Sequence, residues 1–513
     1  MEIKAIYFFI LALFILISPD PFSMAYAGLL FLLVMKLMWR SNEPKHLFIG
    51  LLMYWFVVAL LLPYGAFFKI PLSDLSEYGK SNTLVLANFL ALTSLLFFMI
   101  GIYLPLKNIF ILNLKSVESY LVRYDGKKLF IVYVIFSVSS NFFLKYMLSA
   151  SAGQLLIALV NFKWVLLTFL ITHTLLFSAN QKYVIILVAV EFFLSFSGFW
   201  SNFKDYLIVA LGSFLMLNRT IKIKNFIFIF ISVLIGYFFL VFWSFSKGEY
   251  RRYLTGGERS QVVLKNDTFE NLGVLFKIFQ RDFLSDNFAE NFADGSQRLL
   301  YRISYIDYFS LTLSRVPTFM PHENGKLTQE AFQHIFKPRL FFPDKKIIDD
   351  SEITSKYTGK SFSGINEGAS FSLGLVPECY IDFGLYLMFI PVFIYGIWIG
   401  LMYKFFLVKG YNIIWGLCYT APMYNFLTCY GIPSTKFLGW SLTYFFGIWF
   451  INKYLVAFLD RWMLKKIITV YKTFITRIIS IFSNVVKHIP TNFFQIIFKF
   501  QTNFILIFIS NYL

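Results

Sequence analysis

Long apolar runs dominate the chain, and short polar segments separate them instead of alternating with apolar residues one by one. In a lipid environment, a run of about 20 residues rich in Leu, Ile and Phe can satisfy its backbone hydrogen bonds only as a helix. The pattern therefore predicts an all-α membrane bundle of about 12 spans. The predicted spans are residues 5–18, 22–39, 47–68, 83–104, 129–148, 163–179, 183–200, 204–218, 225–245, 376–403, 411–430 and 437–457.

These spans divide the chain into four regions. Residues 1–245 hold spans one to nine, residues 246–375 form one large loop, and residues 376–457 hold the last three spans. In residues 458–513, basic and polar positions recur at helical spacing opposite Ile and Phe. That pattern predicts an amphipathic tail suited to an anionic membrane surface.

The large loop is itself divided by composition. Residues 271–287 and 294–313 have helix-like patterns, whereas residues 315–368 are rich in Pro, Gly and Lys and read as irregular structure. The loop is long enough to fold into a cap over the bundle.

Composition and charge indicate that the chain lies in a membrane and how it is oriented there. The chain is 58% hydrophobic and only 14% charged, which excludes a soluble protein. Its formal charge of +18 comes mainly from short loops and the tail, because the large loop has nearly as many acids as bases. The uneven charge predicts two cytoplasmic termini and an outer location for the large loop, and it argues against a nucleic-acid partner.

The cysteines and the first apolar run carry no site of their own. Cys379, Cys418 and Cys429 fall in or beside apolar runs, where a thiol behaves as a small hydrophobe, so neither a disulfide framework nor a metal site is predicted. The first run lacks a small-residue cleavage site and reads as a retained span. No soluble-enzyme motif is present, so chemistry is expected at the outer face of the membrane.

A basic strip in the large loop is the first candidate site. Residues 337–346 read Lys-Pro-Arg-Leu-Phe-Phe-Pro-Asp-Lys-Lys, and two prolines stiffen a segment that carries Arg339 and Lys345. A guanidinium binds phosphate oxygens in a bidentate manner, so the strip predicts a diphosphate clamp. The alternative is an ion pair of Arg339 with Asp344 or Asp349.

Two acids at the entry of span ten are candidate general bases. Glu378 and Asp382 lie four residues apart, so they share a helix face near the outer boundary. They could instead cap the helix. His322 and His334 lie in the loop and rank below the acids, because a loop histidine is more often solvated.

Two ionisable residues are predicted within the bundle. Glu191 lies near the middle of its span, and His173 lies on the preceding one. Such a group is a functional candidate because its burial is costly, but an interhelical hydrogen bond that fixes packing is the favoured interpretation here.

With these features, the chain resembles the O-antigen polymerase (Wzy) family, within the wider group of bacterial polysaccharide polymerases and lipopolysaccharide ligases. The resemblance rests on the spans, the single large outer loop, the Pro-Arg-x-Phe-Phe-Pro-Asp-Lys strip, and Gly-x-x-Pro-Glu-x-Tyr-x-Asp-Phe-Gly at 374–384. It implies an architecture like that of GT-C glycosyltransferases. It also points to Arg339, then Arg302 and Arg315, as diphosphate ligands. Ser197-Gly198 and Lys204 are similar to the family's Ser-Gly-x-Arg turn, although the spacing and the lysine depart from that pattern.

The resemblance implies a membrane glycosyltransferase of the bacterial inner membrane. Such an enzyme transfers a glycan from undecaprenyl diphosphate to the non-reducing end of a new lipid-linked repeat unit. The implied partners are this lipid-linked glycan, the bilayer, a chain-length regulator and a flippase. No cofactor is expected, because the donor already stores the energy, and the catalyst needs only cations for the leaving group and a base for the attacking hydroxyl.

Three other functions stay open from the sequence. A flippase or transporter of lipid-linked oligosaccharide would need polar residues along a central path. A lipopolysaccharide ligase would share the donor but use another acceptor. A polyprenyl-phosphate-sugar glycosyltransferase would be expected to carry an acidic pair in its first outer loop, where this chain has only Asp20.

Overall fold

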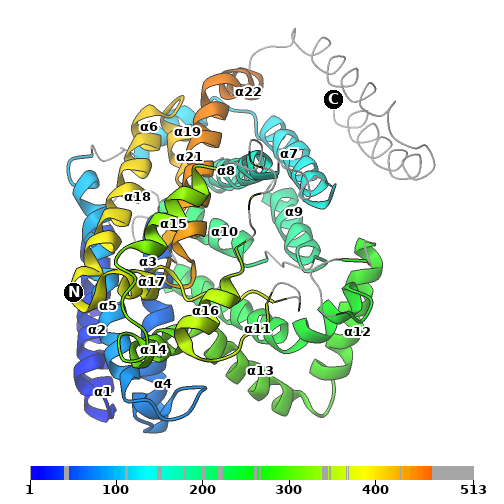
Figure 1. Cartoon of the computed structure of the whole chain (residues 1–513). Coiled ribbons are helices and arrows are strands. Elements are labelled where there is room, and N and C mark those ends of the chain that lie inside the picture. Colours follow the sequence, from blue (N-terminus) through cyan, green and yellow to red (C-terminus); the bar gives the residue numbers. More distant parts are fainter. Residues whose placement is uncertain are drawn as a thin grey trace. The chain divides into compact units, whose positions relative to one another are not determined.

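The computed structural model is built of helices joined by short turns (Figure 1). It describes residues 2–39, 45–109, 114–146, 153–177, 181–198, 203–217, 223–258, 263–264, 267–337, 342, 345, 348–364, 367, 369–427 and 429–464. Within these ranges there is no β-strand, so the predicted all-α class is confirmed. The predicted tail, apart from its first residues, lies outside the described ranges.

In the part that the structure describes, the first half of the chain forms eleven α-helices and one short 3-10 helix. They are α1 (Glu2–Ile17), α2 (Pro21–Met38), α3 (His46–Ala59), α4 (Leu61–Phe68), η1 (Leu72–Asp74), α5 (Thr83–Leu106), α6 (Leu114–Leu121), α7 (Gly126–Tyr146), α8 (Gly153–Phe177), α9 (Gln181–Leu194), α10 (Phe203–Leu217) and α11 (Ile223–Leu254).

The second half begins with shorter helices and returns to long ones. They are α12 (Thr268–Phe283), α13 (Phe288–Ile303), α14 (Ile306–Arg315), α15 (Lys326–Ile335), α16 (Asp350–Thr358), α17 (Leu375–Leu387), α18 (Phe389–Lys409), α19 (Ile413–Tyr419), η3 (Ala421–Met423), α20 (Tyr424–Leu427), η4 (Cys429–Gly431), α21 (Ser434–Tyr454) and α22 (Val456–Met463).

Among the described residues, five helices are long and apolar enough to cross a membrane, and two bent pairs raise the number to seven. The five are Pro21–Met38, Thr83–Leu106, Val160–Phe177, Phe230–Leu254 and Phe389–Lys409. The bent pairs are α3 with α4, at 43°, and α21 with α22, at 57°. The chain is thus compatible with a multi-pass membrane protein. Helices α1, α9 and α10, with 16, 14 and 15 residues, are shorter than the roughly 20 residues of a full span.

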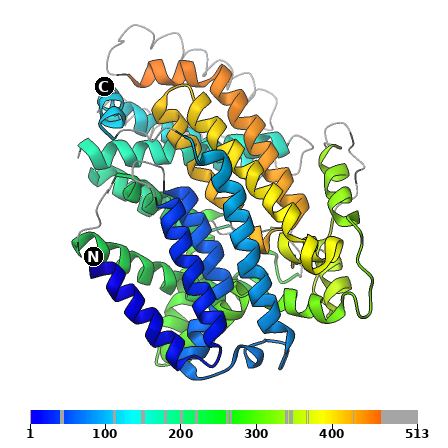
Figure 2. The same ribbon diagram turned by 90° about the vertical axis from the view of Figure 1, so that its left-hand side faces the viewer.

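Helices α5 and α18 run side by side, as Figure 2 shows, and small residues let their backbones approach closely. A Cβ added at Gly396 would lie 2.3 Å from the carbonyl oxygen of Phe98, and one at Gly400 would lie 2.6 Å from that of Ile102. Gly396 and Gly400 form a Gly-x-x-x-Gly motif, which supports close helix pairs in membranes. This motif is a packing signal that the apolar pattern alone does not single out.

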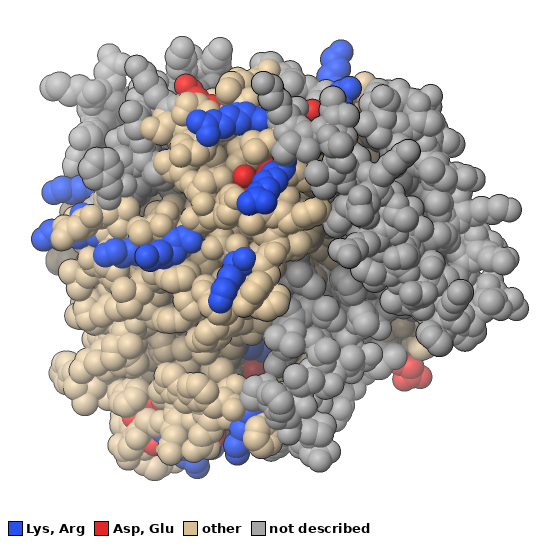
Figure 3. Space-filling view, turned by 90° about the horizontal axis from the view of Figure 1, so that it is seen from above, with Lys and Arg blue, Asp and Glu red and all other residues tan. Residues whose placement is uncertain are grey.

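One end of the bundle is held by a buried polar network around Asp460. Its Oδ1 accepts hydrogen bonds from the Tyr124 hydroxyl, from Asn412 Nδ2 at 3.1 Å and from Trp415 Nε1 at 2.7 Å. These contacts join α22, α19 and the turn before α7. Figure 3 views this end from above, and lysine and arginine side chains project from the described surface there. Exposed basic residues on these elements include Arg123, Lys127 and Arg461.

The segment expected to be one span at 411–430 is instead broken into α19, η3, α20 and η4. Most of its described residues are buried. Irregular backbone at membrane depth is tolerated where protein surrounds it, and that condition holds here.

The large loop is more helical than its composition indicates. Helix α11 continues to Leu254, past the predicted span boundary at 245. The predicted helix at 294–313 is interrupted at Ser304 and Tyr305, giving α13 and α14, and the region expected to be irregular contains α15 and α16. Helices α12 and α13 pack on α11 through a core of buried apolar residues that includes Val241, Phe242, Leu275, Phe283 and Leu299.

Candidate functional site

Helix α17 positions the two predicted acids. It begins after Gly374, whose φ of 92° is unfavourable for other residues, and it kinks at Gly384 before α18. A Cβ at Gly374 would lie 1.6 Å from the carbonyl oxygen of Tyr430, so only glycine fits this close approach. Helix α17 lies outside the helices long enough to cross a membrane.

Glu378 is 6% exposed and faces the start of α21. Its Oε2 accepts hydrogen bonds from the backbone N–H of Ser434 at 2.8 Å and from the Ser434 hydroxyl. Burial raises the pKa of Glu378 to about 7, against the opposing effect of the Ser434 hydrogen bonds. A carboxyl that titrates near neutral pH can both accept and release a proton.

Asp382 is 1% exposed and caps a different helix. Its two oxygens accept hydrogen bonds from the backbone N–H groups of Leu327 and Thr328, at 3.0 and 2.8 Å, and from the Thr328 hydroxyl at 2.6 Å. These donors belong to the first turn of α15, whose unpaired N–H groups and positive dipole end attract a carboxylate. The two acids of α17 therefore hold two other helices, α21 and α15.

A second group of charges lies where α11 packs on α13. Lys247 and Arg251 are one turn apart on α11, and Arg298 and Arg302 are one turn apart on α13. The positive charges of Arg251, Arg298 and Arg302 all act on Lys247, and that of Arg302 acts on Arg251. We call these four residues the cationic cluster.

The acids nearest to the cationic cluster along these helices are each engaged by an arginine. Asp294 binds Arg298 within the cluster, with an oxygen to nitrogen distance of 2.8 Å. Glu249 binds Arg281 on α12 through two hydrogen bonds of 3.0 and 2.7 Å. The Arg302 side chain reaches solvent, yet burial by surrounding protein lowers its pKa. Arg251 and Arg302 thus bring two guanidinium groups together with Lys247 where two helices pack, and guanidinium groups suit an anionic ligand such as phosphate.

Polar residues connect the cationic cluster with Glu378. Tyr305 lies three residues after Arg302, and the charges of Arg302 and Asp350 both act on its side chain. Asp350 pairs with Lys436 near the start of α21 and acts electrostatically on Glu378. Arg302, which the sequence predicts as a ligand, and Glu378 therefore belong to one polar region.

The other predicted ligands are more scattered. Arg315 ends α14 beside Gly359, and its Nε is buried with no hydrogen-bond partner among the described residues. Lys345 donates to the carbonyl oxygen of His334. Lys204 is exposed at the start of α10. Arg339 and most of its strip lie outside the described residues.

The predicted turn at Ser197 lies beside α11. The Ser197 carbonyl oxygen accepts a hydrogen bond from the Tyr250 hydroxyl at 2.8 Å. Tyr250 stands one residue before Arg251 of the cationic cluster, so this turn packs at the same end of α11.

The two loop histidines have separate surroundings. His322 Nδ1 lies 3.2 Å from the carbonyl oxygen of Ile381, and the ring meets Tyr380 edge to face. His334 is half-buried in the last turn of α15. His322 is thus the histidine that contacts α17.

The predicted ionisable residues of the bundle are buried in contact with polar groups. Glu191 accepts hydrogen bonds from the Tyr133 and Ser137 hydroxyls and lies 3.7 Å from Lys163 Nζ. His173 Nε2 lies 3.3 Å from the carbonyl oxygen of Tyr124. Glu191 joins α7, α8 and α9, as expected of a group that fixes packing.

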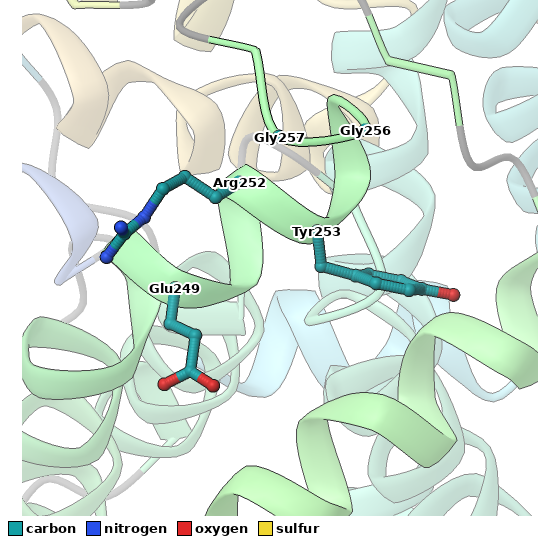
Figure 4. Close-up of a pocket in the computed structure, with 5 residues that line it drawn as sticks. All are labelled: Glu249, Arg252, Tyr253, Gly256 and Gly257. Atoms are coloured by element: carbon teal, nitrogen blue, oxygen red, sulfur yellow. The ribbon is translucent and has the colours of Figure 1, made fainter.

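A shallow pocket at the end of α11 contains none of the predicted site residues. Figure 4 shows Glu249 and Arg252 on one side of the helix, Tyr253 pointing the other way, and Gly256 and Gly257 in the following turn. Glu249 is engaged by Arg281, and the Tyr253 hydroxyl donates to Glu270 at 2.7 Å. Across the described part of the chain, no three His, Cys, Asp or Glu side chains gather closely enough to hold a metal ion.

Sequence reasoning missed three members of the cationic cluster: Lys247, Arg251 and Arg298. A signal for them exists, because each helix carries two basic residues four positions apart. It was hidden because Lys247 and Arg251 follow an apolar run whose helix was expected to end at residue 245.

The fold and site together define a class: a protein that is helical throughout its described residues, with several helices able to cross a membrane and a cationic cluster on α11 and α13. Residues 99–413, more than half of the chain, match the family described as Domain of unknown function (DUF8712), and the chain belongs to that family. The match spans the cationic cluster and both acids of α17. No curated protein and no solved structure is significantly similar to the chain.

Proposed function

We propose that the protein is a membrane glycosyltransferase that polymerises oligosaccharide units carried on undecaprenyl diphosphate. In this proposal the chain has about 12 spans and a GT-C-like architecture, counting helices shorter than a full span. Both termini lie in the cytoplasm, the large loop faces the periplasm of a bacterial inner membrane, and the product is O-antigen or a similar surface polysaccharide.

The cationic cluster is the observation that carries the proposal. A lipid diphosphate is the dense anion available at a membrane surface, and it gains negative charge as it leaves the sugar. Arg251 and Arg302 supply positive charge from two packed helices, and Arg guanidinium groups suit phosphate oxygens. Arg339 and Lys345 remain candidates for further contacts to the same group.

Glu378 is the proposed base. The attacking sugar hydroxyl loses its proton to Glu378, its oxygen bonds to the anomeric carbon of the donor, and the bond from that carbon to the diphosphate oxygen breaks. The lipid diphosphate leaves with the bonding electrons. A pKa near 7 suits Glu378 for this role, whereas Asp382 is occupied by three donors from α15 and is assigned to positioning.

The test is reconstitution of the purified protein in lipid with undecaprenyl-diphosphate-linked repeat units from its own host. We expect a ladder of longer lipid-linked glycans, and a loss of roughly 100-fold in rate in Arg302→Ala. Arg252→Ala is the matched control, because Arg252 is an exposed arginine of α11 that lies next to the cationic cluster in the chain but outside it. Equal ladders from both variants would remove the cationic cluster from the mechanism.

A second candidate function is a flippase of the same lipid-linked glycan. The observation that favours it is the Lys163–Glu191 pair, since buried charges inside a bundle often mark a transport path. The reconstitution distinguishes the flippase from the polymerase. Substrate that crosses liposome bilayers without elongation would support the flippase and contradict the polymerase. A ladder that requires lipid A core as the acceptor would instead support a lipopolysaccharide ligase.

A further inference from the structure

Helix α12 exposes large apolar side chains along a strip of its surface. Phe269 is 80% exposed, Phe276 is 56% exposed, and Leu284, one residue after the helix, is 66% exposed. Their spacings of seven and eight residues place them on the same side of the helix. We call these three residues the apolar strip. Helix α12 is buried against α11 and α13 through Leu275 and Ile278 on its other side and through Phe283 at its end.

The buried residues of α12 pack against α11, within its candidate membrane span Phe230–Leu254. Phe279 and Phe283 of α12 both contact Phe238 and Phe242 of α11, with ring centroids 5.3 to 6.2 Å apart. On α13, Phe292 contacts Tyr237 and Phe238. The α12–α13 hairpin therefore returns along α11 beside its residues 237–245, which lie inside the apolar run of that helix. A cap standing in water above the bundle would not reach this level.

The exposed apolar surface continues from α12 onto α11. Phe230, Val233, Leu234 and Tyr237 of α11 are 43% to 56% exposed, as expected of a helix that faces lipid. Phe288, at the start of α13, is 41% exposed. Removing apolar side chains from water is favourable, so a continuous surface of this kind favours an apolar environment over water.

Polar residues mark where that environment ends. Lys277 and Arg281 are exposed beside the apolar strip, and Asp286 is exposed in the turn between α12 and α13. Charges at these positions do not suit the centre of a bilayer, but they suit its headgroup region, where basic side chains also meet anionic lipids.

We propose that the α12–α13 hairpin lies in the membrane interface, with the apolar strip inserted among lipid acyl chains and Lys277 and Arg281 at the headgroups. The inference rests on the packing of α12 and α13 against α11 and does not depend on the proposed function. Its consequence is positional: Lys247, Arg251 and Arg302 then stand at headgroup level, where a membrane-anchored phosphate or diphosphate would lie.

The test uses spin labels on adjacent residues of the full-length protein in nanodiscs of phosphatidylethanolamine and phosphatidylglycerol. Labels on Phe276→Cys and Lys277→Cys differ by one position along α12, so they share the same local fold. We expect the label at 276 to collide several-fold more with oxygen, which dissolves in lipid, than with a water-soluble nickel complex, and the label at 277 to show the reverse preference. Labelling of the parent protein, in which Cys379 and Cys418 are buried, supplies the background.

Two results would overturn the proposal. Equal access of the nickel complex to both labels would place the apolar strip in water. Shielding of both labels from oxygen and nickel alike would show that a second copy or another protein covers it. If Phe276→Cys or Lys277→Cys folds poorly, the pair Phe269→Cys and Glu270→Cys repeats the comparison at the start of α12.

Discussion

At the scale of single residues, Glu378 is the buried acid whose protonation the fold controls most clearly. Its pKa rises from 4.5 to about 7 on folding, so the folded protein holds a proton that the unfolded chain releases between these values. This proton stabilises the fold fully below about pH 4.5, and the contribution is lost as the pH rises through about 7. The difference corresponds to about 3 kcal/mol.

Glu378→Gln tests this linkage. The amide oxygen can still accept from Ser434, but the side chain no longer titrates, so we expect the melting temperature to fall less between about pH 4.5 and about pH 7 than in the parent protein. Glu330→Gln, on the exposed side of α15, is the control and should keep the parent profile. If Glu378 is the base, glycan transfer is lost in the same variant. An unchanged melting profile in Glu378→Gln would contradict the assignment of a raised pKa.

At the scale of helices, the contact between α5 and α18 depends on a glycine. A methyl group at residue 396 would press against the Phe98 carbonyl oxygen, which belongs to helix backbone and cannot move alone. We expect Gly396→Ala to lower the free energy of unfolding by about 1–3 kcal/mol. The measurement is thermal denaturation in detergent.

The matched control is Gly273→Ala in α12. No atom lies within 4 Å of a Cβ at that position, so the substitution should be neutral or should stabilise by a fraction of about 1 kcal/mol. Equal effects of the two substitutions would mean that close packing of α5 on α18 does not determine stability.

Helix capping across elements is also visible at this scale. Glu378 and Asp382 differ by one turn, yet the first holds the start of α21 and the second holds the start of α15. The spacing of the acids predicts a shared face, and it cannot predict which helices approach that face. The capping role that the sequence left open is thus realised on neighbouring helices rather than on α17 itself.

At the scale of the whole molecule, the distribution of charge predicts its orientation. Exposed basic residues such as Lys404 gather where α18 ends, whereas Lys360 is exposed in the large loop. Under the positive-inside rule, these two positions lie on opposite sides of the membrane. We expect a membrane-impermeant maleimide to label Lys360→Cys in intact cells and to label Lys404→Cys only after permeabilisation. Labelling of both variants in intact cells would refute this orientation.

Some features of the site were accessible from the pattern of residues, and others were not. Glu378 stands out as an acid at the predicted entry of a span, and Arg302 is implied by the family resemblance alone. Both fall in one polar region of the structure. Lys247 and Arg251 do not stand out, because they follow a long apolar run. They form a cationic cluster only because α13 packs beside them and contributes Arg298 and Arg302. Arg315 lies beside Gly359 in the structure, and the pattern of residues along the chain contains no sign of that contact.

The sequence by itself determined the helical class and the apolar character that suits a membrane, because long apolar runs leave the backbone no other way to satisfy its hydrogen bonds. It also located the acids of α17 and the basic strip at 337–346. Only the tertiary structure decided that residues 411–430 break into short helices, that the α12–α13 hairpin returns along α11, and that four cations from two helices meet. These outcomes depend on contacts between segments far apart in the chain, which local hydrophobicity and spacing do not encode.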